Sequence, residues 1–95
     1  MRANTTGKFI SAAGAIETVT LGYTPSYVKV NNVTTNIVYE YFNDGTNIVG
    51  ISTAGATGVI TQGDASIVKT ADGFTVAAAT LTTSDVVYFK AERLY

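Results

Sequence analysis

The chain has 95 residues, with no cysteine and no histidine, and only 14% of its residues are charged. This length allows one domain with a thin core. The missing residue types exclude disulfide bridges, the usual zinc sites and nucleophile–histidine catalysis. The formal net charge is −1. Phosphate binding needs clustered Lys or Arg, and the few basic residues here are scattered, so the sequence predicts no direct contact with nucleic acid.

The N-terminal residues 1–7 are predicted to form a polar arm, and residues 8–95 a single β domain. The start of the chain lacks the apolar stretch of a secretory signal. No apolar run approaches the ~20 residues that cross a membrane as a helix. We therefore expect a protein made in a cytoplasm, with no membrane partner.

The composition favours strands, because Val, Ile, Thr, Tyr and Phe dominate and fit a pleated surface. Alternating or apolar stretches predict the first strands at residues 8–12, 16–21 and 26–33. Pro25 cannot donate a hydrogen bond to a neighbouring strand, so it marks the turn before the third strand.

A β-hairpin is predicted at residues 36–51, where two apolar runs flank Asp44-Gly45. Asp-Gly favours a two-residue turn, because both central residues need a positive φ. Such a turn places Tyr41 opposite Ile48.

Both faces of this hairpin are apolar. One face carries Tyr39, Tyr41 and Ile48, and the other carries Val38, Phe42, Val49 and Ile51 together with Glu40. We assign the second face to the core and the tyrosine face to an interface. A bulge in either strand would exchange the two faces.

The second half of the domain continues as strands. A small-residue loop at 52–58 precedes strands at 58–62, 65–70, 74–78 and 85–92. A two-residue turn at Asp72-Gly73 would place Lys69 opposite Val76 on one face, so a longer loop or a bulge is expected there. The fold class is therefore all-β with almost no helix, an antiparallel sandwich or small barrel of about eight or nine strands. A jelly-roll-like arrangement fits the same spacing.

No catalytic, cofactor-binding or metal-binding motif is predicted. Glu17 and Glu40 are the carboxylates that a paired acid–base site would use, but charged strand residues are mostly exposed. Asp44 and the residues around it lack the ligand spacing of a calcium loop. The tyrosines at 23, 27, 39 and 41 suggest either a stacking platform for sugars or bases, or a core or interface surface. The second interpretation is favoured, because aromatic strand residues usually serve it.

Two stretches of the chain carry a resemblance to a known family. Gly22-Tyr23-Thr24-Pro25-Ser26-Tyr27-Val28-Lys29-Val30-Asn31-Asn32 leads into Tyr39-Glu40-Tyr41, and Asp72-Gly73-Phe74-Thr75-Val76 is followed after a loop by residues 85–91. This layout, over residues 16–92, is similar to the capsid decoration or cement proteins of tailed bacteriophages.

The resemblance implies an all-β protein that binds the outside of the virion capsid. Such proteins commonly sit as homotrimers and bridge neighbouring subunits of the major capsid protein. The interface residues expected here are Tyr39, Tyr41, Ile48, Tyr27 and Tyr23. The alternative function is a phage tail or fibre domain that binds a glycan on the host surface.

Overall fold

The structure is a computed structural model that describes residues 3–12, 15–44 and 47–93. Within these residues, nine strands form two antiparallel sheets, and one short 3₁₀ turn is the sole helical segment. The elements are β1 (Ala3–Ile10), β2 (Glu17–Thr20), β3 (Tyr27–Asn32), β4 (Ile37–Asn43), β5 (Ile48–Ala54), β6 (Ile60–Gln62), β7 (Ile67–Thr70), β8 (Gly73–Val76), η1 (Ala78–Thr80) and β9 (Val86–Arg93). The predicted all-β sandwich is confirmed.

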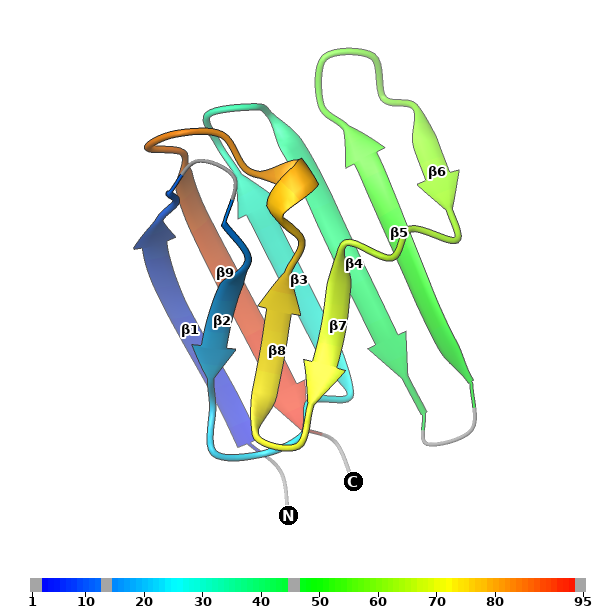
Figure 1. The fold of residues 1–95 in the computed structure, drawn as a ribbon. Coiled ribbons are helices and arrows are strands. Elements are labelled where there is room, and N and C mark those ends of the chain that lie inside the picture. Colours follow the sequence, from blue (N-terminus) through cyan, green and yellow to red (C-terminus); the bar gives the residue numbers. More distant parts are fainter. Residues whose placement is uncertain (1–2, 13–14, 45–46, 94–95) are drawn as a thin grey trace.

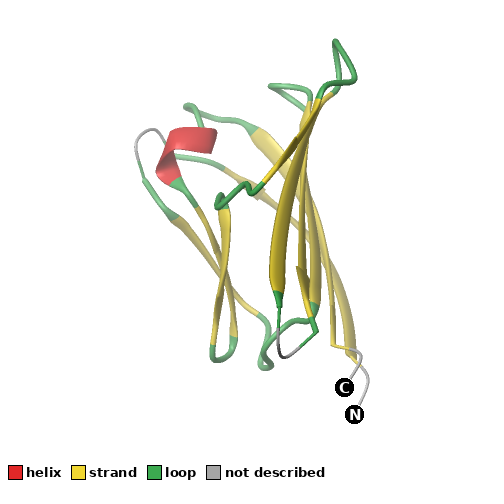
Figure 2. Cartoon of the chain, turned by 90° about the vertical axis from the view of Figure 1, so that its right-hand side faces the viewer, coloured by secondary structure: helices red, strands yellow, loops and turns green. Residues whose placement is uncertain are grey.

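The two sheets form two layers of unequal width (Figures 1 and 2). The larger sheet has six strands in the order β1-β9-β3-β4-β5-β6, and the smaller has three in the order β2-β8-β7. Figure 1 shows the smaller sheet in front of the first four strands of that order, with β5 and β6 extending beyond it. We call the face of the larger sheet that turns toward the smaller sheet its inner face, and the opposite face its outer face.

The core lies between the layers. Alternation in β3 buries Val28 and Val30 completely, and Phe74 and Val76 of β8 face them from the smaller sheet, also with no exposed surface. Burying each of these side chains stabilises the fold by about 1.5–3 kcal/mol. The ring of Phe74 meets that of Phe89 edge-on, with ring centres 5.5 Å apart.

The predicted N-terminal arm is wrong for residues 3–7, which belong to β1. This strand pairs antiparallel with β9 along its whole length. The polar side chains of residues 3–7 gave no strand signal, because main-chain hydrogen bonds to β9, rather than apolar packing, hold this part of β1 in place. Gly7 lies opposite Phe89, and a Cβ at this glycine would be 2.5 Å from the phenyl ring. The close packing of β1 on that ring therefore requires glycine.

The register predicted for the first hairpin is also wrong. Asn43 pairs with Ile48, and Tyr41 lies opposite Gly50 rather than Ile48. Four residues separate the paired ends instead of two. Asp44 supports this longer loop, because its carboxylate accepts a hydrogen bond from the Asn47 N–H at 2.7 Å. Gly45, the other residue of the predicted turn, is outside the described residues.

The second hairpin has the tight turn that was not expected. Thr70 pairs with Gly73, so its loop is only Ala71 and Asp72. Lys69 then lies opposite Phe74 and not Val76. The expectation of a longer loop or a bulge is wrong because β8 begins at Gly73 and includes the glycine that was assigned to the turn.

Candidate functional site: the exposed face of the larger sheet

The two faces of the β4–β5 hairpin carry the predicted groups of residues, but their inside and outside positions are reversed. Tyr39 and Tyr41 are 6% and 2% exposed and belong to the core. Phe42 and Val49, which were assigned to the core, are 41% and 42% exposed. Glu40 was the signal for the correct choice, because a carboxylate among apolar residues is far cheaper to place on the solvent side.

The outer face of this hairpin carries an apolar patch built from cross-strand neighbours. In one row, Tyr27, Phe42 and Val49 lie side by side on β3, β4 and β5. The rings of Tyr27 and Phe42 have centres 5.1 Å apart and are tilted by 51°. We call the five residues Tyr27, Val38, Phe42, Val49 and Ile51 the outer patch. Its side chains stand on a continuous sheet, as an interface surface does.

One charged residue is set within the outer patch. The Tyr27 hydroxyl donates a hydrogen bond to the Glu40 carboxylate at 2.9 Å. Burial, this hydrogen bond and the nearby charges of Glu40 and Glu92 raise the pKa of Tyr27 to about 12. The phenol therefore stays protonated near neutral pH and keeps donating. This bond fixes the ring of Tyr27 against Phe42.

The other half of the outer face mixes charged and apolar side chains, and Ile10 and Tyr88 are 53% and 47% exposed there. On β9, Lys90 forms an ion pair with Glu92 at 3.2 Å. The ammonium of Lys8 lies 5.8 Å from the centre of the Tyr88 ring, across the β1–β9 pair. A partner that covers the whole face would thus meet mainly apolar side chains over β4 and β5, and a mixture of charged and apolar ones over β1 and β9.

The structure distributes the predicted interface residues over different places. Tyr39 and Tyr41 are buried, so they form no exposed stacking platform for a sugar. Ile48 is 59% exposed on the inner face, where β5 extends past the smaller sheet. Of the five predicted interface residues, Tyr27 is the one that lies in the outer patch. The Tyr23 hydroxyl bonds to the Thr5 hydroxyl and donates to the Ala91 carbonyl at 3.1 Å, a structural contact.

A buried polar network at one end of the sandwich was missed by the sequence reasoning. Asp85 has no exposed surface, and its carboxylate accepts hydrogen bonds from the Asn32 amide at 2.9 Å and from the N–H and hydroxyl of Thr82. Its own N–H donates to the Ser11 hydroxyl at 2.9 Å. The hydrogen bond from the Thr82 hydroxyl lowers the pKa of Asp85 most, and the hydrogen bond from the Asn32 amide lowers it further. The network joins β3, the residue that follows β1 and the loop before β9.

The structure does not bring the candidate carboxylates together. Glu17 lies on β2 of the smaller sheet, whereas Glu40 is on the outer face of the larger one. Among the described residues, no group of three or more His, Cys, Asp or Glu side chains is placed to hold a metal ion. In the same part of the chain, no helix is both long enough and apolar enough for a membrane crossing.

The chain was compared with known proteins in three ways. A scan against protein-family models, a search of curated proteins and a search of solved structures each returned no match.

Proposed function

We propose that this protein is a non-enzymatic virion protein that binds the outer surface of a bacteriophage capsid as a homotrimer and holds neighbouring capsid subunits together. The outer patch is the observation that carries this proposal. It supplies exposed aromatic and aliphatic side chains on a continuous sheet, which is the kind of surface that binds another protein. The resemblance of residues 16–92 to capsid decoration proteins supports the same function.

The outer patch has the chemistry of an interface centre. Phe42 supplies a large ring, and Tyr27 a second ring whose hydroxyl is already bonded to Glu40. Aromatic residues in the centre of an interface often contribute most of the binding energy. The charged residues over β1 and β9 lie beside this centre, where they would set the orientation of a partner.

The mechanism of stabilisation is linkage. A protein that binds across the boundary between two capsid subunits favours the assembled shell, because separated subunits no longer offer the complete site. No chemical step is involved. The expected consequence is a particle that releases its DNA at a higher temperature when this protein is bound.

The test uses capsids of the phage that encodes this chain, prepared without the protein. Adding the purified protein should restore the temperature of DNA release, and a density map of the particles should show trimers on the shell. Phe42→Ser should weaken binding by about 2 kcal/mol, as for an interface anchor. The matched control is Ile16→Thr, which changes another exposed apolar residue, 63% exposed, on the smaller-sheet side of the molecule.

The proposal fails if complete and depleted particles release DNA at the same temperature. It also fails if density for the protein is found on the tail instead of the shell, which would support the glycan-binding alternative. Equal loss of binding in the Phe42→Ser and Ile16→Thr variants would show that the outer patch is not the contact surface.

A further inference from the structure

The smaller sheet ends at β7 while the larger sheet continues. β7 pairs with β8 on one side only and lies over β4. Figure 1 shows β5 and β6 extending past β7, with no strand of the smaller sheet in front of them. The inner face of β5 is therefore open beside the free edge of β7.

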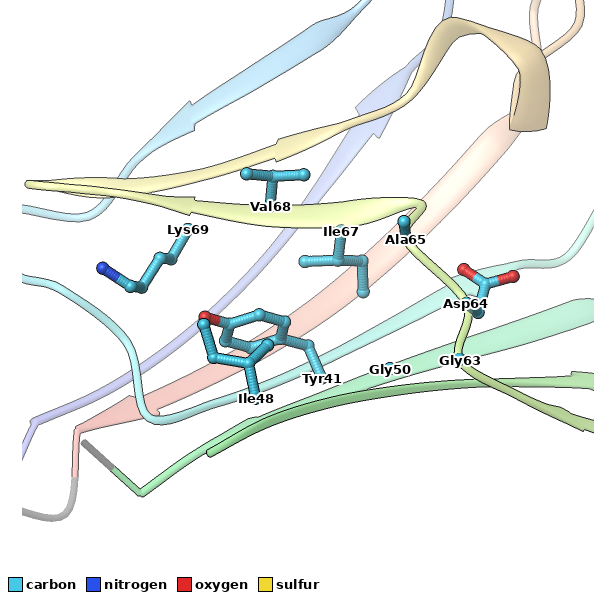
Figure 3. Close-up of a pocket in the computed structure, with 9 residues that line it drawn as sticks. All are labelled: Tyr41, Ile48, Gly50, Gly63, Asp64, Ala65, Ile67, Val68 and Lys69. Carbon is cyan, nitrogen blue, oxygen red and sulfur yellow. The ribbon is translucent and has the colours of Figure 1, made fainter. Parts of the chain in front are cut away.

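This opening is a groove of about 460 Å³ (Figure 3). Tyr41, Ile48 and Gly50 of the larger sheet line one side, and β7 lines the other. The connection from β6 to β7 closes one end, because the carbonyl oxygen of Asp64 lies directly over Gly50, 1.7 Å from where a Cβ would be, and the Asp64 N–H donates to the Gly50 carbonyl. The groove is mainly apolar and lies beside the free edge of β7.

The free edge of β7 offers main-chain hydrogen-bonding groups to this groove. In an antiparallel pair, hydrogen bonds to one neighbour come from alternate residues. The Ala77 N–H donates to the Ser66 carbonyl, so the main-chain groups of Ser66 face β8. Because the pattern alternates, those of Val68 face β8 as well. Ile67 and Lys69 then direct their N–H and C=O groups to the open side. Within the described chain these groups have no hydrogen-bond partner.

Two side chains add polar character to the groove. The Tyr41 hydroxyl is buried and meets no partner in hydrogen-bond geometry within the described residues. Burial raises the pKa of Tyr41, and the nearby Asn43 side chain opposes that shift. Lys69 is exposed at the open end, and no carboxylate of the described chain forms an ion pair with it. Figure 3 shows the Tyr41 hydroxyl directed toward the end of the groove where Lys69 lies.

We propose that this groove binds an extended segment of a partner protein, which adds to the edge of β7 as a fourth strand of the smaller sheet. The segment carries a small apolar residue beside Ile67 and, two positions away, an acidic residue beside Lys69. Strand addition gives affinity through main-chain hydrogen bonds and specificity through alternate side chains. The groove would take such a segment from any protein that presents it.

The dimensions and charge select this partner. β7 has four residues, so the added strand spans about 13 Å at ~3.3 Å per residue. Residues opposite Ile67 and Lys69 on the added strand share the face of these two side chains, which line the groove. A lysine on a free edge discourages pairing with neutral or basic strands. An acidic residue opposite it turns the same charge into a favourable cross-strand pair.

The probe is a capped heptapeptide, acetyl-Thr-Val-Thr-Glu-Thr-Val-Thr-amide, which places Val two positions from Glu in both directions and therefore fits either strand orientation. It is titrated into the full chain labelled with ¹⁵N, and amide shifts and hydrogen exchange are followed. The Ile67 and Lys69 amides should shift and exchange more slowly. A peptide with Lys in place of Glu should bind about fivefold more weakly, and a peptide N-methylated at the Val and Glu residues should not protect the two amides.

A charge exchange makes the test specific. Lys69→Glu should weaken binding of the Glu peptide and strengthen binding of the Lys peptide, and this variant keeps an exposed residue that the fold does not need. The proposal is overturned if the Ile67 and Lys69 amides do not respond at millimolar peptide. It is also overturned if they become protected without peptide as protein concentration rises, since a second copy would then be the occupant. The third contrary result is a medium-chain fatty acid that shifts the groove residues while the peptide does not.

Discussion

Asp85 and Tyr41 both bury a polar group in this sandwich, but they differ in how many hydrogen-bond partners that group has. Both carboxylate oxygens of Asp85 accept hydrogen bonds, and the network around it joins β3, the residue that follows β1 and the loop before β9. Tyr41 has a buried hydroxyl that meets no partner in hydrogen-bond geometry within the described chain, at the side where the smaller sheet ends. One end of the sandwich is closed by polar contacts, and one side is left open.

The difference separates a structural polar group from a candidate binding group. A buried polar group with all its partners contributes to stability and fixes the loops that it joins. A buried hydroxyl without a partner costs free energy in the isolated chain. This cost is recovered if a ligand or partner strand supplies the missing hydrogen bond. Substitutions at the two places should therefore have opposite effects on stability.

The largest effect is expected for Asp85→Asn. An amide has one acceptor oxygen and no charge, so it cannot accept all the hydrogen bonds that the carboxylate accepts from Asn32 and Thr82. The thermal midpoint should fall by on the order of 10 °C. Thermal unfolding followed by circular dichroism measures this. Asp72→Asn is the control, because Asp72 is exposed in the β7–β8 loop. An equal, small change in both variants would contradict a structural role for the network.

Acid should remove the same contribution in the wild-type chain. The network lowers the pKa of Asp85 in the folded state, whereas in the unfolded chain an aspartate titrates near ~3.9. Asp85 therefore stabilises the fold fully above that pH, and its contribution is lost as the pH falls through the folded-state pKa. Urea unfolding between pH 7 and pH 2 should show the wild-type chain and Asp85→Asn converging in acid. A constant difference would mean that Asp85 does not titrate differently on folding.

An intermediate effect is expected for Gly50→Ala, at the closed end of the groove. The added Cβ would stand 1.7 Å from the Asp64 carbonyl oxygen, so the connection between β6 and β7 must move away from β5. The free energy of unfolding should decrease by about 1–3 kcal/mol. Ser52→Ala, two residues along the same face of β5, is the control. If Gly50→Ala is as stable as the control, the connection does not close the groove as the structure has it.

The sequence predicted the strands well where apolar and polar residues alternate. It predicted less well which face of a strand is buried, because contacts between the two sheets decide that. The strands around Val28 and Val87 were found because apolar residues alternate there. The two faces of β4 were grouped correctly but their inside and outside positions were exchanged, because both faces are apolar. The error in the length of the Asp44 turn is separate, because a register shift of two residues keeps each side chain on its face. Glu40 was the one local signal that could have corrected it.

The sites could be predicted only in part. Tyr27 was named, but Phe42 was placed in the core. Lys69 and Tyr41 come together in the groove only because the smaller sheet stops at β7, and no local pattern reports how many strands a sheet will have. The Asp85 network joins residues more than 50 positions apart in the chain, so it too depends on the tertiary fold.

The smallest effect, and the sharpest test of the contrast between the closed end and the open side, is expected for Tyr41→Phe. The substitution removes a buried hydroxyl that meets no partner in hydrogen-bond geometry within the described residues, and it keeps the ring that packs in the core. The free energy of unfolding should stay the same or rise by up to about 1 kcal/mol, because the cost of burying the hydroxyl is relieved. Tyr23→Phe is the matched control, since the same atom is removed where it bonds to Thr5 and Ala91, and it should lose about 1 kcal/mol. Chemical unfolding of the three proteins side by side measures both changes. If Tyr41→Phe loses as much stability as Tyr23→Phe, the Tyr41 hydroxyl has a partner in the folded chain, and the groove has no hydroxyl to offer a fourth strand.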